Sequence, residues 1–314
     1  MRLHPLRVAL ILILVVEAAS PLRAAQEPAF NRSSDVIYGR KFGMALTMEV
    51  FAPKKDANGA AVVWVVSGGW FSARESAEPT PFSPVSELVK RGYTVFAVVH
   101  GSQPKFTIPE ILQDMNRAVR FIRSRAADYK IDPDRIGITG GSAGGHLSLM
   151  QGMAGDLGDP KAKDPVLRVS SRVQCVACFF PPTDFLNYGG EWVNALGRGI
   201  LADFKAPFAF VELEKKKWAG EFVPVTEEAK ILEIGKRISP VNHVTPDDPP
   251  SLINHGDADK LVPIQQAELI IDRLKKAGVA CDLVVKKGAA HGWPKINEDM
   301  KTIAGWVDKY LAKK

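Results

Sequence analysis

One glycine-rich segment near the middle of the chain restricts the possible folds more than any other. Residues 136–139 form a β-branched, mostly apolar run, and glycines then surround Ser142 and Ala143 before a helical pattern begins. The Gly140-x-Ser142-x-Gly144 spacing is typical of a sharp strand-to-helix turn that lifts a serine hydroxyl out of a sheet edge. Such a turn needs glycine because its backbone is strained and its neighbours leave no room for a Cβ. The segment therefore predicts a strand, a turn and a helix, with Ser142 as a candidate nucleophile. The alternative is a glycine-rich turn without chemistry.

Strand-like and helix-like segments alternate along most of the chain. Apolar runs predict buried strands, and a short antiparallel pair is predicted to open the fold; these strands are residues 37–38, 44–51, 60–66, 93–99, 173–180, 251–254 and 281–285. Helical spacing predicts helices at 84–91, 107–122, 263–274 and 297–311, with a capping box formed by Thr107 and Glu110 and with Asn297 as the cap of the last helix. The repeated strand-then-helix order implies an α/β fold, a mostly parallel sheet with helices on both faces.

Residues 185–246 interrupt this alternation. The segment holds eight aromatic residues and shows no strand pattern. We interpret it as a helical cap inserted into the sheet domain, because such elements shape pockets. An alternative, which does not exclude the first, is that its aromatic side chains fill a small core of their own.

The N-terminus has the pattern of a secretory signal peptide. Arg2 and Arg7 precede nine apolar residues, and small and polar residues follow as far as Ala24. Glu17 ends the apolar run well short of the roughly 20 residues that a membrane span needs. We therefore expect residues 1–24 to be removed on export to the periplasm or beyond, which leaves no stable membrane span, and residues 25–314 to form the folded domain. A retained N-terminal anchor is the alternative.

The charge pattern argues against a nucleic-acid-binding protein, and the cysteine positions argue against a disulfide-linked or zinc-binding protein. The net charge of +6 is spread over short lysine runs rather than a basic stripe interleaved with aromatics, so nucleic-acid binding is not expected. Cys175 and Cys178 lie three residues apart in a predicted strand and therefore point to opposite faces. This placement disfavours both a disulfide and a zinc site. We expect these two residues and Cys281 to be buried free thiols.

A serine hydroxyl becomes a useful nucleophile only when a base accepts its proton and a third group orients that base. Of the six histidines, His291 lies on a loop just past the last predicted strand. The carboxyl ends of parallel strands share one edge, which is also the edge of Ser142, so His291 is the best candidate base. Three acids also follow strands at that edge: Asp257, Asp259 and Asp184. Of the other histidines in the folded part, His146 suits packing or orientation of the serine turn and His255 suits a structural role. His100 closes a predicted strand, and His243 lies where the chain leaves the segment 185–246.

Taken together, these segments resemble the α/β-hydrolase superfamily, in its esterase/lipase branch near exported acetyl-xylan/feruloyl-type esterases and prolyl-oligopeptidase-like hydrolases. The resemblance covers nearly all of residues 35–312. It rests on the serine turn, on the H-G-D-A-D-K-L-V-P loop that begins at His255, and on the H-G-W sequence that begins at His291. It implies that Ser142 is the nucleophile, Asp259 the acid and His291 the base of an α/β-hydrolase fold.

One motif departs from the family pattern. After the first parallel strand the family has H-G-G-[GA]-W, whereas this chain has Ser67-Gly68-Gly69-Trp70, without a histidine. The donors that stabilise a tetrahedral oxyanion are main-chain N–H groups, so this change does not remove them. We assign the oxyanion hole to Gly69 and Ala143, with Gly68 or Trp70 as alternatives for the first position. Acyl transfer of this kind requires no metal and no cofactor.

The resemblance implies an exported serine carboxylesterase that acts on a small-molecule or polysaccharide-linked ester, with acetylated or feruloylated polysaccharide as the expected class. Two alternatives stay open. The first is a prolyl-oligopeptidase-like peptidase, against which the absence of a long N-terminal propeller domain argues. The second is a catalytically silent protein that binds carbohydrate or a partner through its aromatic cap. The sequence does not specify the oligomeric state.

Overall fold

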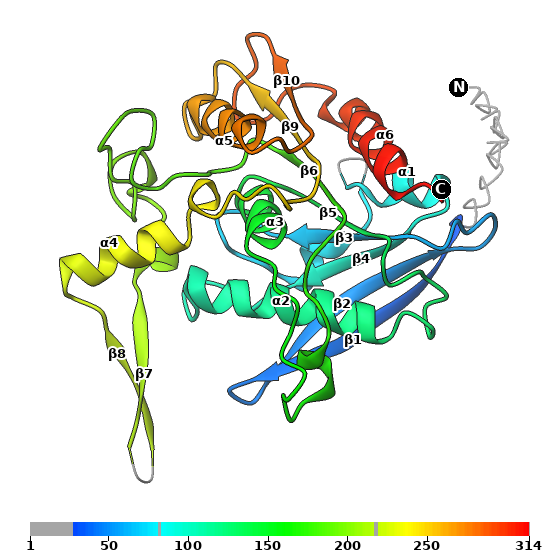
Figure 1. Cartoon of the computed structure of the whole chain (residues 1–314), viewed down its shortest axis with the longest axis horizontal. Helices are drawn as coiled ribbons and strands as arrows, with labels where there is room; N and C mark the ends of the chain where they lie inside the picture. The colour runs from blue at the N-terminus through cyan, green and yellow to red at the C-terminus, as the bar shows by residue number, and fades with distance from the viewer. Residues whose placement is uncertain (1–27, 81–82, 217–218, 314) are drawn as a thin grey trace, which may run out of the picture.

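The computed structural model describes residues 28–80, 83–216 and 219–313, and its centre is one eight-stranded sheet (Figure 1). The predicted signal segment, residues 1–24, lies outside the described residues. In spatial order the strands are β1 (Phe30–Lys41), β2 (Met44–Pro53), β4 (Thr94–Val99), β3 (Ala61–Val66), β5 (Ile136–Gly141), β6 (Cys175–Phe179), β9 (Ser251–Gly256) and β10 (Cys281–Lys286). No helix in the described part of the chain is both long and apolar enough to cross a membrane.

The sheet is parallel from β4 to β10, and only the pairs β1–β2 and β2–β4 are antiparallel. The predicted opening hairpin and mostly parallel sheet are therefore confirmed. Strands β3, β4, β5 and β6 are almost entirely buried, which explains their near-continuous apolar sequences. Because these strands run in the same direction, the loops that follow them lie along one edge of the sheet.

Helices cover both faces of the sheet. The core on one face contains α2 (Ile108–Ser124), α3 (Ala143–Met153) and α5 (Gln265–Lys276), and the core on the other contains α1 (Val85–Lys90) and α6 (Met300–Leu311). The predicted capping box of α2 is present, since the Thr107 N–H donates to the Glu110 carboxylate at 2.8 Å. The predicted cap of the last helix was wrong. Asn297 lies in a 3-10 turn (Ile296–Asp299) that precedes α6, so Asp299 occupies the N-cap position.

The segment 185–246 contains more than helix. Besides α4 (Glu228–Arg237) and three short 3-10 turns, it includes a β-hairpin of β7 (Val211–Lys215) and β8 (Gly220–Pro224). The expectation that this segment has no strands was therefore wrong. The hairpin projects from the body of the protein (Figure 1), and most of its residues are exposed, so it has no buried apolar face for a sequence pattern to reveal. That the segment acts as a cap stays a prediction.

Several aromatic side chains of this segment join the main core, whereas Trp192 and Phe222 are exposed. The rings of Phe185 and Phe208 lie 5.7 and 5.2 Å from the ring of Trp70, between centroids. Tyr188 and Phe210 belong to the same buried cluster. The segment is therefore anchored directly beside the turn that contains Gly69 and Trp70.

The cysteines match the sequence prediction in part. All three are free thiols. Cys175 and Cys178 are fully buried and belong to cores on opposite faces of the sheet, as their spacing predicted. Cys281 is only partly buried, because β10 is an edge strand with a less covered surface.

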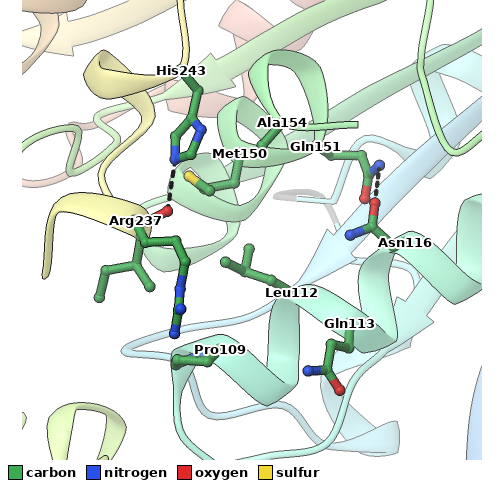
Figure 2. A pocket seen from close by; sticks show the side chains of 10 residues that line it. Pro109, Leu112, Gln113, Asn116, Met150, Gln151, Ala154, Arg237 and His243 are labelled. Atoms are coloured by element: carbon green, nitrogen blue, oxygen red, sulfur yellow. Dashed lines mark hydrogen bonds between the residues drawn. The ribbon is translucent and has the colours of Figure 1, made fainter. Parts of the chain in front are cut away.

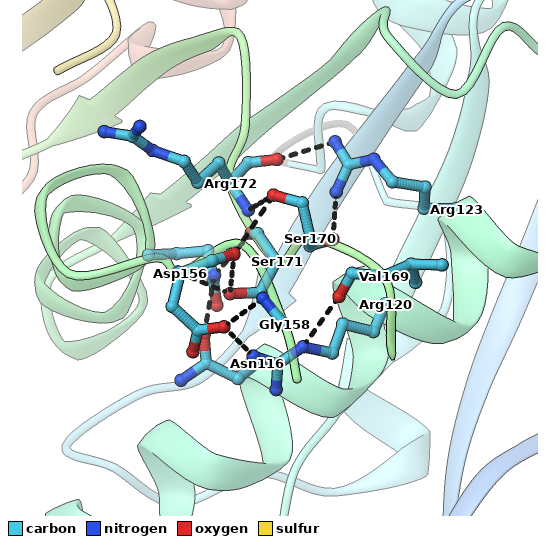
Figure 3. Close-up of polar contacts among 10 residues, drawn as sticks. Asn116, Arg120, Arg123, Asp156, Gly158, Val169, Ser170, Ser171 and Arg172 are labelled. Atoms are coloured by element: carbon cyan, nitrogen blue, oxygen red, sulfur yellow. Dashed lines mark hydrogen bonds and ion pairs between the residues drawn. The ribbon is translucent and has the colours of Figure 1, made fainter. Parts of the chain in front are cut away.

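Arginine side chains fasten the long connection between α3 and β6 to helix α2 (Figure 3). Arg120 pairs with Asp156 at the start of this connection. Arg123 donates to three backbone carbonyl oxygens, those of Pro133, Ser170 and Arg172. The connection has only one short 3-10 turn of its own, Pro165–Arg168, so these guanidinium groups supply hydrogen bonds that regular secondary structure would otherwise provide.

Candidate active site

Ser142 occupies the strained turn between β5 and α3. Its φ of +54° and ψ of −120° are unusual for a residue with a side chain. A Cβ on Gly140 would lie 2.5 Å from the Gly144 carbonyl oxygen, and a Cβ on Gly144 would lie 2.8 Å from the Val65 carbonyl oxygen. Both glycines are therefore required by close backbone contacts. The turn is held by the Ser142 N–H, which donates to the Phe179 carbonyl at 3.0 Å.

The structure brings the three predicted side chains together at one edge of the sheet. The Oγ atom of Ser142 lies 2.9 Å from Nε2 of His291, and Nδ1 of His291 lies 2.7 Å from Oδ2 of Asp259. Each residue follows a different parallel strand: Ser142 follows β5, Asp259 follows β9 and His291 follows β10. The carboxylate can accept from Nδ1–H, which leaves the Nε2 lone pair facing the serine hydroxyl.

The surroundings of Asp259 keep it ionised. Burial acts to raise the pKa of this carboxyl group, but hydrogen bonds from His255, His291 and the Val262 N–H lower it well below the usual range. Its Oδ1 atom accepts from the N–H groups of Leu261 and Val262, each at 2.9 Å. The carboxylate is therefore fixed in place and charged at neutral pH.

The other two candidate acids lie elsewhere. Asp257 accepts a hydrogen bond from the Gly288 N–H at 2.6 Å and pairs with Lys287 at 3.1 Å. It therefore stabilises the loop that precedes His291 without contacting the imidazole. Asp184 accepts from the N–H groups of Leu186 and Asn187 and is a turn residue. Of the three candidate acids, Asp259 is the one that contacts the imidazole of His291.

The turn between Gly68 and Phe71 has two residues in the left-handed region. Gly69 has a φ of +54° and Trp70 a φ of +60°, and Gly68 and Phe71 exchange two backbone hydrogen bonds of 2.9 Å. The Gly68 N–H is therefore engaged within the turn. The Gly69 N–H has no acceptor among the described residues. Ala143 is the first residue of α3, where helix geometry leaves N–H groups without intrahelical partners.

Histidines outside this group have structural partners. His146, four residues beyond the serine, accepts from the Trp70 indole N–H at 3.1 Å and donates to the Ile238 carbonyl at 2.7 Å. It therefore connects the turn at Trp70 to the segment after α4. His255 Nε2 lies 2.8 Å from the Val262 carbonyl and 3.5 Å from Asp259 Oδ2.

A cavity of about 430 Å³ opens beside Ser142. Its lining comes from β3, the turn after β3 and the serine turn, and includes Trp64, Ser67, Phe71 and Phe180. Sequence reasoning missed Phe180. The one available signal was its position directly after β6, at the same edge of the sheet.

A separate cavity of about 350 Å³ lies between α2, α3 and the end of α4 (Figure 2). Leu112, Met150 and Arg237 contribute to its walls, and none of the three residues grouped at the serine lines it. Among the described residues, no cluster of three or more histidine, cysteine, aspartate or glutamate side chains could hold a metal ion.

A parallel sheet with a serine at a strand-to-helix turn, and with histidine and aspartate after later strands, defines an α/β hydrolase. Within this class, the BD-FAE family model matches residues 48–274, well over half of the chain, and the protein belongs to that family.

Two curated relatives are named as ester hydrolases. LipM of Mycobacterium tuberculosis, a probable carboxylic ester hydrolase, is 29% identical over 252 residues, which is 79% of this chain and 52% of LipM. The esterase LipQ of the same organism is 27% identical over 251 residues, 79% of this chain and 54% of LipQ. The chain therefore spans about half the length of these relatives.

Two solved structures share the fold over most of their length. A truncated form of a carbohydrate esterase from gut microbiota superimposes with a TM-score of 0.71 at 27% identity, covering 91% of this chain and 99% of that one. An acetyl ester-xyloside bifunctional hydrolase from Caldicellulosiruptor lactoaceticus gives a TM-score of 0.69 at 24% identity, covering 88% and 96%.

Proposed function

We propose that the protein is an exported serine carboxylesterase that uses Ser142, His291 and Asp259. The observation that supports this most directly is the continuous hydrogen-bonded path from Ser142 Oγ to His291 Nε2 (2.9 Å) and from His291 Nδ1 to Asp259 Oδ2 (2.7 Å). These contacts join a nucleophile, a base and an orienting acid. The family and the named esterase relatives support the same reaction class.

The mechanism follows from these contacts. His291 accepts the proton of Ser142 as the serine oxygen attacks the ester carbonyl carbon, and Asp259 stabilises the imidazolium that forms. The tetrahedral oxyanion accepts hydrogen bonds from the Gly69 and Ala143 N–H groups. His291 then gives its proton to the leaving alcohol, and a water molecule repeats the attack on the acyl-enzyme with His291 again as base. The carboxylic acid leaves and Ser142 recovers its proton.

The substrate proposal is an ester carried by a polysaccharide, with acetyl or feruloyl as the acyl group. It is supported by the similarity to a truncated form of a carbohydrate esterase, which aligns over 99% of that truncated chain, and by the cavity beside the serine. Export is proposed from the signal-peptide pattern of residues 1–24.

The test compares the wild type with Ser142→Ala on p-nitrophenyl acetate. We expect the substitution to lower kcat by several orders of magnitude, because removing one member of a triad removes most of its effect. A wild-type rate equal to that of Ser142→Ala contradicts the esterase proposal and favours the silent binding protein. Acetylated xylan, methyl ferulate and an aminoacyl p-nitroanilide, assayed side by side, separate polysaccharide esters from simple esters and from peptidase activity.

A further inference from the structure

His100 is a buried histidine that the mechanism above does not use. It follows β4 and is 3% exposed. Its Nδ1 atom lies 2.8 Å from the Gly101 carbonyl oxygen, and its Nε2 atom lies 2.9 Å from Ser67 Oγ. Because a carbonyl oxygen can only accept, Nδ1 carries the ring hydrogen. In the neutral ring Nε2 then accepts a hydrogen bond from the Ser67 hydroxyl. Burial lowers the pKa of His100 to about 4, so the ring is neutral near pH 7.

The backbone on both sides of His100 is held in place. The Tyr38 hydroxyl donates to the Val99 carbonyl at 3.0 Å, and the Gly101 N–H donates to the buried carboxylate of Asp114 at 3.0 Å. The imidazole is therefore presented to Ser67 from a rigid support.

More hydrogen bonds join the loop after β4 to the loop after β3. The His100 N–H donates to Ser72 Oγ at 3.3 Å, and the Ser72 hydroxyl donates to the Val66 carbonyl at 2.5 Å. The Gln103 N–H donates to the Trp70 carbonyl at 3.3 Å. The bonds made by Ser72 and by the Trp70 carbonyl hold the C-terminal side of the turn that contains Gly69. The contact between Ser67 and His100 holds its N-terminal side, immediately before Gly68.

We propose that His100 is a positioning residue for the oxyanion hole: through Ser67 it fixes the turn that presents the Gly69 N–H. This inference rests on the proposed esterase function. It also accounts for the missing histidine in the motif after the first parallel strand, because the neighbouring strand β4 supplies an imidazole to that turn. Ser67 is thus part of a serine–histidine pair that orients backbone donors and does not itself react.

Kinetics of four variants test the pairing. Ser67→Ala and His100→Leu each remove the hydrogen bond between Ser67 and His100. The double variant loses the same single hydrogen bond. His100→Gln retains a side-chain acceptor.

We expect kcat to fall by about 10-fold to 100-fold in Ser67→Ala and in His100→Leu with little change in KM, because an oxyanion contact is made only in the transition state. The double variant should be no slower than the slower single variant, since both act through one contact. His100→Gln should recover much of the rate. Ser124→Ala, which removes an exposed hydroxyl at the end of α2, is the matched control.

Amide hydrogen exchange gives a second readout that does not depend on turnover. In Ser67→Ala and His100→Leu, a peptide covering residues 67–72 should exchange faster than in the wild type, and it should be unchanged in Ser124→Ala. Unchanged exchange in this peptide, or melting temperatures that fall while kcat stays the same, would overturn the positioning role. If the wild type hydrolyses no ester, the proposed function fails, and the exchange measurement still decides whether His100 fixes the turn.

Discussion

The ring of Phe180 packs against the imidazole of His291, with centroids 4.4 Å apart and ring planes at 53°. Phe180 has a φ of +33°, which is rare for a residue with a side chain, and its N–H donates to the Asn254 carbonyl at 2.8 Å. The same residue lines the cavity beside Ser142 and a smaller cavity of about 160 Å³ formed largely by apolar side chains. Its ring therefore both limits the space near the serine and supports the base.

Replacing this ring should change acyl-chain selectivity. We predict that Phe180→Ala joins the two cavities and raises the ratio of kcat/KM for p-nitrophenyl hexanoate to that for p-nitrophenyl acetate by about tenfold, since added methylenes gain about 1–3 kcal/mol when a hydrophobic pocket accepts them. The absolute rate on acetate should fall because His291 loses a packing partner. Phe222→Ala, on the exposed hairpin, serves as the control. Equal losses on all chain lengths would show that Phe180 only supports the base.

The two aspartates of the loop after β9 should respond very differently to amidation. Asp259→Asn removes the acceptor for His291 Nδ1–H, and we predict a decrease of kcat by about 10⁴-fold, the scale known for the corresponding change in a serine protease triad. Asp257→Asn, which affects an exposed contact to Lys287, should retain activity within about twofold. Steady-state kinetics on one short ester measure both. Loss of activity in Asp257→Asn alone would make Asp257 the acid and the assignment of Asp259 wrong.

Buried neutral histidines should make stability depend on pH. Burial lowers the pKa values of His100 and His146 to about 4, whereas the unfolded chain binds these protons near pH 6.5. Between pH 6.5 and 4 the unfolded state therefore binds more protons than the folded state. As the pH is lowered through this range, the free energy of unfolding should decrease by about 1.4 kcal/mol per pH unit for each histidine. Urea unfolding at pH 7, 6 and 5 measures the slope. A constant free energy of unfolding over this range, or ring NMR signals of His146 that titrate near pH 6.5, would contradict this prediction.

Much of the site could be predicted because it depends on local sequence and strand direction. The serine turn is encoded by glycines at 140 and 144, and parallel strands carry the segments after β9 and β10 to the same edge. Phe180 and His100 could not be assigned this way. Their roles come from contacts with residues far away in the sequence, His291 and Ser67, that only the packed structure provides. The β7–β8 hairpin was missed because its exposed strands lack a buried face.

Arg120 and Arg123 on α2 should contribute to stability and not to catalysis. Arg123 donates to the backbone carbonyls of Ser170 and Arg172 (Figure 3) and to that of Pro133, and all three lose this donor on truncation. We predict that Arg123→Ala lowers the free energy of unfolding by about 2–4 kcal/mol, because three hydrogen bonds from a charged donor are lost together. Arg125→Ala is the control, since its ion pair with Asp128 is exposed and should contribute less than about 1 kcal/mol. Denaturant unfolding of both variants, with kcat measured in parallel, checks the separation. A large change in kcat for Arg123→Ala would link this loop to the site.

The central claim is that Ser142 is a nucleophile activated by His291, and covalent trapping tests it most directly. The wild-type protein is incubated with diethyl p-nitrophenyl phosphate, and the site of modification is located by mass spectrometry of peptides. The account predicts one diethylphosphoryl group per chain on Ser142, one equivalent of released p-nitrophenol, and no modification in Ser142→Ala or His291→Ala within the same time. Absence of modification on Ser142, or equal modification of His291→Ala, would contradict it.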